Sequence, residues 1–113
     1  MDAKLCIWSF YYFELSPEEA VKEFKKHGIS CFELASEHGG QLLSRGEPEA
    51  VGKRFREFIR SENFTVTQGH LWLGGKLCGP CEDIHELLRW IRLYEAIGIE
   101  NAVLHLEDVY KRQ

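Results

Sequence analysis

The sequence predicts an α/β fold built on a parallel sheet, and three observations support this prediction. Short apolar runs alternate with segments whose apolar residues have helical spacing. The same Gly-Ile pair follows two of these helical segments, and no change in composition marks a domain boundary. Strands separated by helices form parallel units with right-handed crossovers. The sequence therefore favours either a closed barrel or a doubly wound open sheet.

The first strand and the first helix are indicated by an apolar run and a capping box. Residues 5–10 are apolar enough for a strand that is buried on both faces. Ser16 suits the N-cap of a helix, Pro17 suits its first position, and Glu19 completes the capping box. We expect the helix to end near Gly28, because glycine readily adopts the left-handed conformation after a helix.

The same pattern predicts three more strands and two more helices. We expect strands at residues 31–35, 64–69 and 102–106. A helix that begins at Pro48 would bury a stripe made of Val51, Phe55, Phe58 and Ile59. After a loop at residues 73–80, the next helix would bury Ile84, Leu87, Leu88 and Ile91. Two glycine pairs, Gly39-Gly40 and Gly74-Gly75, predict mobile loops on the ligand side.

Composition indicates a soluble globular domain. The chain has 113 residues, of which 44% are hydrophobic and 28% charged, enough for one small core. Its net charge of −4 gives no basic surface for nucleic acid. The sequence shows neither a long apolar run nor a secretory leader, so we expect a cytoplasmic protein without membrane contact. Its four cysteines are then expected to be reduced thiols.

The carboxyl ends of the predicted strands carry Trp8, Glu33, His70 and His105. Ligands bind at these strand ends in parallel α/β folds, whether the sheet closes or stays open. Each ionisable residue taken alone is explained by a hydrogen bond or an ion pair with a neighbour. Three of the four predicted strands, however, end in an ionisable residue. We therefore expect at least two of these three side chains to face a common pocket.

Five segments extend this interpretation: KLCIWSF, SPEEA, GISCFEL, QGHLWL and GIENAVLH. Together they resemble the first half of xylose isomerase-like barrels, a superfamily of sugar and sugar-phosphate isomerases and epimerases. The resemblance runs from Lys4 to about Leu106. It implies that residues 1–107 are a truncated, N-terminal half of a parallel β/α (TIM) barrel, containing β/α units one to four of eight.

The resemblance also implies an activity for the parent enzyme. A proton or hydride would move between carbons of an open-chain aldose or ketose. A divalent Mn²⁺, Mg²⁺, Co²⁺ or Zn²⁺ would hold the sugar oxygens and stabilise the developing charge. The metal ligands and catalytic residues would lie on strands five to eight, so the fragment alone is expected to be inactive. The substrate-binding residues of the first half would be Trp8, Glu33, His70, Trp72 and His105.

Two alternative functions remain open at this point. In the related endonuclease IV branch, histidines that end strands three and four bind zinc, and His70 and His105 lie at matching places. That activity requires DNA binding, which the acidic charge does not favour. Cys78 and Cys81 form a Cys-Gly-Pro-Cys motif like the redox dithiol of thioredoxins. With His85 they also suggest a zinc site that lacks an obvious fourth ligand, although a reduced loop is the simplest interpretation.

The last six residues have a separate explanation. Residues 108–113 read Asp-Val-Tyr-Lys-Arg-Gln, which matches the translation of a transposon-end adapter used in sequencing libraries. We expect this tail to be non-native and the natural reading frame to be interrupted near Glu107. Half of a barrel would leave unpaired edges on its first and fourth strands and uncover apolar side chains. We therefore expect the chain to self-associate, at least into a dimer.

Overall fold

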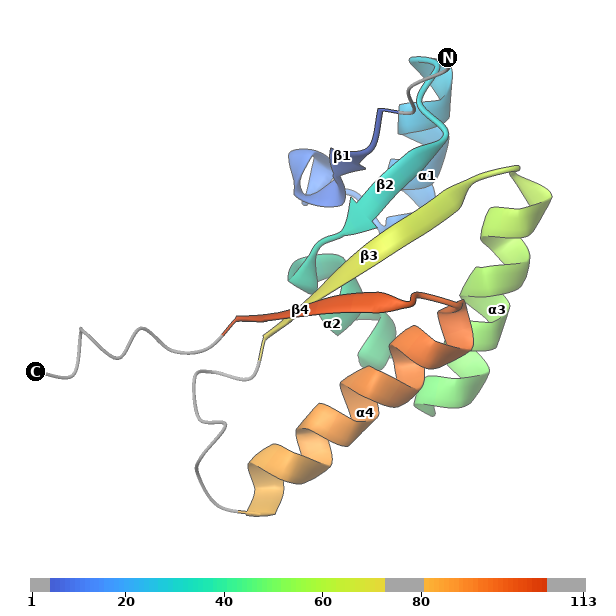
Figure 1. Ribbon diagram of the computed structural model, residues 1–113. Coiled ribbons are helices and arrows are strands. Elements are labelled where there is room, and N and C mark those ends of the chain that lie inside the picture. The colour runs from blue at the N-terminus through green and yellow to red at the C-terminus, as the bar shows by residue number, and fades with distance from the viewer. Residues whose placement is uncertain (1–4, 73–80, 106–113) are drawn as a thin grey trace, which may run out of the picture.

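The computed structural model of the protein describes residues 5–72 and 81–105 (Figure 1). Four strands form one sheet in the order β1-β2-β3-β4, and every pairing is parallel. The strands are β1 (Ile7–Trp8), β2 (Cys31–Leu34), β3 (Thr65–Trp72) and β4 (Asn101–His105). The predicted α/β fold with a parallel sheet is confirmed. The expected tail at residues 108–113 and the loop at residues 73–80 lie outside the described residues.

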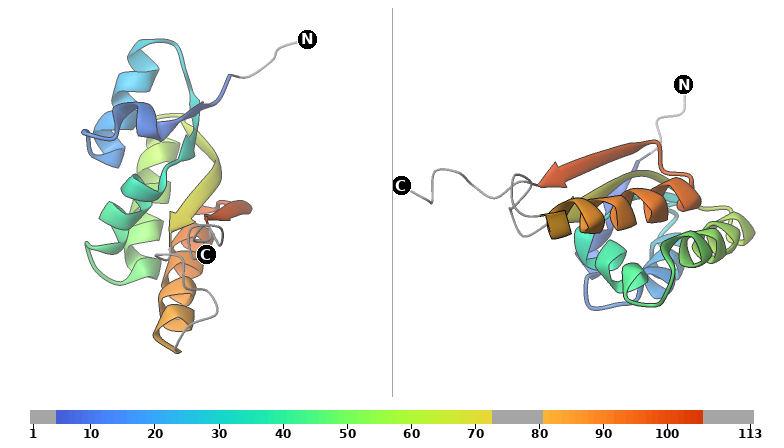
Figure 2. Two further views of the ribbon diagram at one scale, coloured as in Figure 1. Left: turned by 90° about the vertical axis from the view of Figure 1, so that its left-hand side faces the viewer. Right: turned by 90° about the horizontal axis from the view of Figure 1, so that it is seen from below.

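The helices lie on one face of the sheet, as the two views of Figure 2 show. They are α1 (Pro17–Lys26), α2 (Ser36–Leu43), α3 (Pro48–Ser61) and α4 (Cys81–Ile97), and a 3-10 helix, η1 (Ser9–Tyr12), directly follows β1. A doubly wound sheet has helices on both faces. Within residues 5–72 and 81–105 the second face has no helical cover, and we call it the open face. None of the helices in these residues is long and apolar enough to cross a membrane.

The first helix begins and ends as predicted. The Glu19 backbone amide donates to the Ser16 hydroxyl at 3.1 Å, and the Ser16 amide donates to the Glu19 carboxylate at 2.9 Å. Gly28 has a φ of 80°, which only glycine adopts without strain. The amide of Ile29 then donates to the carbonyl of Phe24 at 3.0 Å and closes the last turn.

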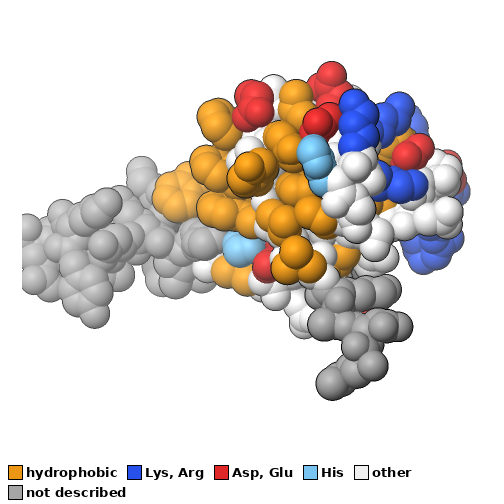
Figure 3. Space-filling view, turned by 90° about the horizontal axis from the view of Figure 1, so that it is seen from above, with side chains coloured by type: hydrophobic (Ala, Val, Ile, Leu, Met, Phe, Trp, Pro, Cys, Tyr) orange, Lys and Arg blue, Asp and Glu red, His pale blue; other side chains and the backbone are white. Residues whose placement is uncertain are grey.

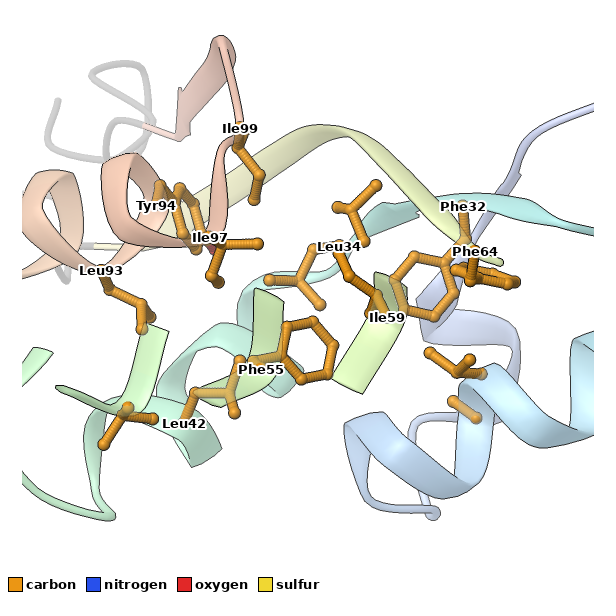
Figure 4. Packing of buried hydrophobic residues seen from close by; sticks show 14 of the residues in the cluster. Phe32, Leu34, Leu42, Phe55, Ile59, Phe64, Leu93, Tyr94, Ile97 and Ile99 are labelled. Carbon is orange, nitrogen blue, oxygen red and sulfur yellow. The ribbon is translucent and has the colours of Figure 1, made fainter. Parts of the chain in front are cut away.

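The core lies between the helices and the covered face of the sheet (Figure 4). Phe32 and Leu34 of β2 are fully buried there, and Phe55 of α3 packs in the same cluster. Gly69 of β3 lets Tyr94 of α4 approach the strand, since a Cβ atom at Gly69 would lie 2.6 Å from the Tyr94 ring. The covered face therefore supplies the close packing on which the fold depends.

Helix α2 was not predicted from the sequence. Gly39 and Gly40 were expected in a mobile loop, but both lie within α2. Gly39 is buried because the rings of Trp90 and Tyr94 pack against it, and a Cβ atom there would collide with both. The first strand is also shorter than expected, because the chain turns into η1 at Ser9. The third strand is longer and continues to Trp72.

The predicted buried stripe of α4 is largely wrong. Ile84, Leu88 and Ile91 are exposed by 46%, 42% and 43%, and only Leu87 of the predicted set packs against the core. The buried residues of α4 are Trp90, Leu93, Tyr94 and Ile97. The helix has two apolar faces, and the face with the larger aromatic side chains packs against the sheet.

The expectation of reduced cysteines is wrong for two of the four. Cys6 and Cys31 form a disulfide, with their Cα atoms 4.9 Å apart. The two residues lie opposite each other, directly before the pair Ile7 and Phe32 in the register of β1 and β2. Such a short cross-strand separation allows a disulfide bond to form. Cys78 and the side chain of Cys81 lie outside the described residues.

Candidate functional site

The candidate site lies on the open face, at the carboxyl ends of the first three strands. The register pairs Trp8 with Glu33, and Glu33 with Gln68. A register shift follows Phe32, which pairs with Val66, so that Thr67 is an extra residue in β3. Such a bulge changes which side chains of a strand point to each face. It brings Gln68 beside Glu33 on the open face.

The same bulge sets the direction of the last residues of β3. Gly69 and Leu71 are buried on the covered face, where Gly69 contacts Tyr94. His70 and Trp72 alternate with them and therefore belong to the open face. The side chain of His70 is 17% exposed and Trp72 is 52% exposed. The strand-end residues His70 and Glu33, singled out from the sequence, thus lie on one surface.

Glu33 is the polar centre of this surface. The Gln68 side-chain amide donates to the Glu33 carboxylate at 2.8 Å, and Nε2 of His70 lies 3.6 Å from the same oxygen. The Glu33 side chain is 34% exposed, so its carboxylate is accessible from the open face. A carboxylate, an amide and an imidazole together can accept and donate hydrogen bonds to a polar ligand.

Aromatic rings border the polar centre on the side of β1. The Trp8 ring lies 5.8 Å from the His70 ring and is stacked on Phe10 at 4.7 Å. Phe10 is in turn stacked on Phe13 at 5.0 Å. Trp8 is 45% exposed, so one part of its ring remains available to a ligand. The site therefore combines an apolar wall with a polar centre, as ligand sites generally do.

Tyr94 supports the third strand at the site from the covered face. Its hydroxyl donates to the backbone carbonyl of His70. Burial raises the pKa of Tyr94, and the carboxylate of Glu37 raises that pKa further. The phenol therefore stays protonated and remains a donor at neutral pH. This hydrogen bond holds the backbone of His70, whose imidazole lies beside Glu33.

A buried hydrogen-bond chain holds the segment that follows β1. The Ser9 hydroxyl accepts from the Ala35 amide at 2.7 Å and donates to Nδ1 of His38 at 2.7 Å. Nε2 of His38 then donates to the carbonyl of Leu15 at 3.0 Å. Burial lowers the pKa of His38, while the hydrogen bond to Leu15 opposes this shift. The chain requires a neutral imidazole with its proton on Nε2.

This Ser9 and His38 pair was not found from the sequence. A serine bonded to a histidine is also the pattern of an activated nucleophile. Here both side chains are buried, and the serine oxygen already accepts a backbone amide. The pair therefore positions η1 against the end of β2, directly after Trp8. The two residues are 29 positions apart, and nothing local in the sequence indicates that they meet.

The remaining candidates from the sequence are only partly placed. The register pairs His105 with Trp72, which puts its backbone at the same edge of the sheet as the site. The side chain of His105 and the residue Cys78 lie outside the described part of the chain. The zinc-binding and dithiol alternatives, which depend on them, remain predictions.

The described residues do not form a metal centre. Among the side chains that the structure describes, those of residues 5–72 and 84–104, no three of the ligand types His, Cys, Asp and Glu come together. Glu33 and His70 supply one carboxylate and one imidazole, which is fewer than the three protein ligands of a typical catalytic site.

Comparison with known proteins found no match among protein-family models, curated proteins or solved structures.

Proposed function

We propose that the open face forms the first half of a pocket for a sugar or sugar phosphate, in an enzyme of the isomerase or epimerase type. The observation that carries the proposal is the meeting of Trp8, Glu33 and His70 at the carboxyl ends of three adjacent strands. The four strands follow one another in sequence order with helices on one face. Half of a closed β/α barrel would have this arrangement, which supports the proposal.

The chemistry of the open face suits a carbohydrate. The Glu33 carboxylate can accept a hydrogen bond from a sugar hydroxyl, because the Gln68 amide already fixes its position. The His70 imidazole can add a donor or an acceptor on the same side. The exposed rings of Trp8 and Trp72 offer flat apolar surfaces for the C–H faces of a sugar ring or chain.

These residues would bind and orient the substrate rather than transfer its proton or hydride. The transfer would use groups on a second half of the pocket, which the resemblance places on four further strands. A divalent cation in that half would polarise the sugar oxygens and stabilise the negative charge that develops. No catalytic step is assigned to Glu33 or His70, whose role in this proposal ends with holding the sugar in place.

The direct test is tryptophan fluorescence of the protein titrated with a panel of aldoses, ketoses and their phosphates. We expect saturable quenching by at least one sugar, with an affinity in the millimolar range because only half of the pocket is present. Glu33→Gln should weaken this binding, since it removes the charged acceptor. Glu49→Gln, an exposed substitution on α3, is the matched control and should leave binding unchanged. Absence of saturable quenching by every sugar would contradict the proposal.

A further inference from the structure

An apolar stripe runs along α4 on the side away from α3. It consists of Ile84, Leu88 and Ile91, which share one face of the helix and are exposed by 42–46%. Helix α3 packs on another side of α4, where Gly52 comes close to the backbone of Leu93. Ile91 also lines a hollow together with Ala102 of β4. The stripe therefore borders the β4 edge of the sheet.

An apolar groove lies at the opposite edge of the sheet. It has a volume of about 280 Å³ and is lined by Ile7, Tyr11, Tyr12, Phe24, His27 and Ile29. These residues come from β1, η1, α1 and the turn after α1. Figure 3 views the molecule from the side on which β1 and α1 lie, and hydrophobic side chains form a broad group there. We call the hollow lined by these six residues the β1 groove.

Both edge strands also have a free side. Within the described residues, β1 pairs only with β2, and β4 pairs only with β3. An unpaired strand edge readily accepts another strand, because its amides and carbonyls have no partner on that side. The stripe at the β4 edge and the groove at the β1 edge thus each accompany an open edge. Both surfaces are apolar, so that covering one with the other would remove apolar area from water.

We propose that two copies of this chain associate head to tail, with the β4 edge and α4 stripe of each copy against the β1 edge and β1 groove of the other. In this arrangement both new strand pairings are parallel, as are the pairings within the chain. An interface between two different surfaces forms a closed ring when the rotation between copies fits. Two four-stranded sheets then close into eight strands, the number at which side chains fill a barrel.

The exposed apolar surface is sufficient for such a dimer. Among the side chains that the structure describes, the large hydrophobic ones that remain exposed are Leu5, Trp8, Tyr11, Phe13, Trp72, Ile84, Leu88 and Ile91. At 42–71% exposure they present together roughly 800 Å², about the area that each partner contributes to a standard interface. Most of them lie on the open face, along the α4 stripe or beside the β1 groove, which are the surfaces that closure covers.

The proposal does not depend on sugar binding. It concerns how the chain covers its own apolar surfaces, and its test uses no ligand. A dimer that binds no sugar would be consistent with the proposed association, whereas a monomer that binds sugar would contradict it.

Sedimentation equilibrium of the full chain is the first test, with a dimer expected at micromolar concentration. Leu88→Arg in the stripe and Tyr11→Arg beside the groove each place a charge in the contact, and each should weaken dimerisation about a hundredfold. Both residues are exposed, so the fold should survive. Lys53→Glu, an exposed change on α3, is the control and should have no effect.

Mixing the two variants tests the head-to-tail geometry. In the mixed pair, the intact groove of Leu88→Arg meets the intact stripe of Tyr11→Arg, so one of two contacts survives and dimer should partly return. A stripe-to-stripe dimer predicts no loss for Tyr11→Arg and no recovery on mixing, and either result would overturn the proposal. A monomeric wild type, or open-ended polymers instead of a closed pair, would overturn it as well.

A measurement on the wild type covers the case in which a variant fails to fold. Closure would reduce the exposure of Trp8 and Trp72, so quenching of tryptophan fluorescence by acrylamide should decrease as protein concentration rises through the dimerisation range. Quenching that is independent of concentration in a sample shown to dimerise would mean that the open face stays uncovered. That result would also overturn the proposal.

Discussion

The two faces of the sheet differ sharply, although the same strands form both. On β2, Phe32 and Leu34 are fully buried beneath the helices, whereas Glu33 between them is one-third exposed on the open face. On β3, Leu71 is buried, whereas its neighbours His70 and Trp72 face the other way. The covered face is built for stability. The open face carries polar and aromatic groups that contribute little to folding and are available for binding.

The largest effect should come from the covered face. Phe32→Ala removes a fully buried ring that contacts Phe24 and Phe64, and it should lower the free energy of unfolding by about 3–5 kcal/mol. Trp8→Ala on the open face removes a larger ring but should cost only about 1 kcal/mol, because that ring is half exposed. Urea denaturation measures both values. Equal losses would show that the open face also stabilises the fold.

The disulfide at the start of the first two strands should have the next largest effect. The Cys6 to Cys31 disulfide joins the residue before the two-residue strand β1 to the first residue of β2, across 25 positions of sequence. Replacing both residues with alanine should cost about 2–4 kcal/mol, mainly through the greater freedom of the unfolded chain. A reducing agent should destabilise the wild type by a similar amount and leave the double variant unchanged. Equal sensitivity of the two proteins to the reductant would contradict the assignment.

A single added methyl group tests the close packing of the covered face. Gly69→Ala would bring a Cβ atom to 2.6 Å from the Tyr94 ring and should cost about 1–3 kcal/mol. Gly40→Ala is the matched control, since its nearest contact would be an ordinary 3.8 Å from the Trp90 ring. In a helix that change should be neutral or mildly stabilising. Thermal unfolding of both variants would show whether the two glycines differ as the packing requires.

The smallest effect should be a dependence of stability on pH that arises at the end of β1. The folded state lowers the pKa of His38, so the unfolded chain takes up a proton at higher pH than the folded one. The stability from neutral His38 is therefore complete above its unfolded pKa of about 6.5 and is lost as pH falls through the lower folded value. His38→Gln should therefore reduce the change in the unfolding temperature between pH 7 and pH 5. Thermal unfolding at each pH measures this change, and a pH dependence equal to that of the wild type would contradict the assignment.

Local sequence signals predicted the elements that depend on neighbouring residues. The capping box of Ser16 and Glu19 and the left-handed Gly28 involve contacts within one turn of the chain. The strand-end positions of Glu33 and His70 follow from the alternation of strands and helices. Parallel strands bring such ends to one edge of a sheet, so their proximity could be expected before their contact was known.

The features that escaped prediction depend on distant partners. Helix α4 has apolar residues on two faces, and periodicity alone cannot show which face meets the sheet. Helix α2 contains adjacent glycines, which are weak helix formers, and its Gly39 is required by Trp90 from a segment far along the chain. The bulge that aligns Gln68 with Glu33 arises from the register between two strands, which no single segment encodes.

The prediction of reduced cysteines was wrong for a different reason. Reduced thiols were expected from an inferred cellular location rather than from the neighbourhood of Cys6 and Cys31. The register of β1 and β2 places these residues opposite each other, and that local geometry is the stronger guide.

The most direct test of the division between the two faces is an NMR titration of the isotopically labelled protein with the sugar that quenches its fluorescence most strongly. We expect amide and side-chain shifts to change at Glu33, Gln68 and His70 and at the Trp8 indole, while those of Phe32, Leu34 and Phe55 remain unchanged. Shift changes centred on the helix-covered face, or none at saturating sugar, would contradict the claim that the open face is a binding surface.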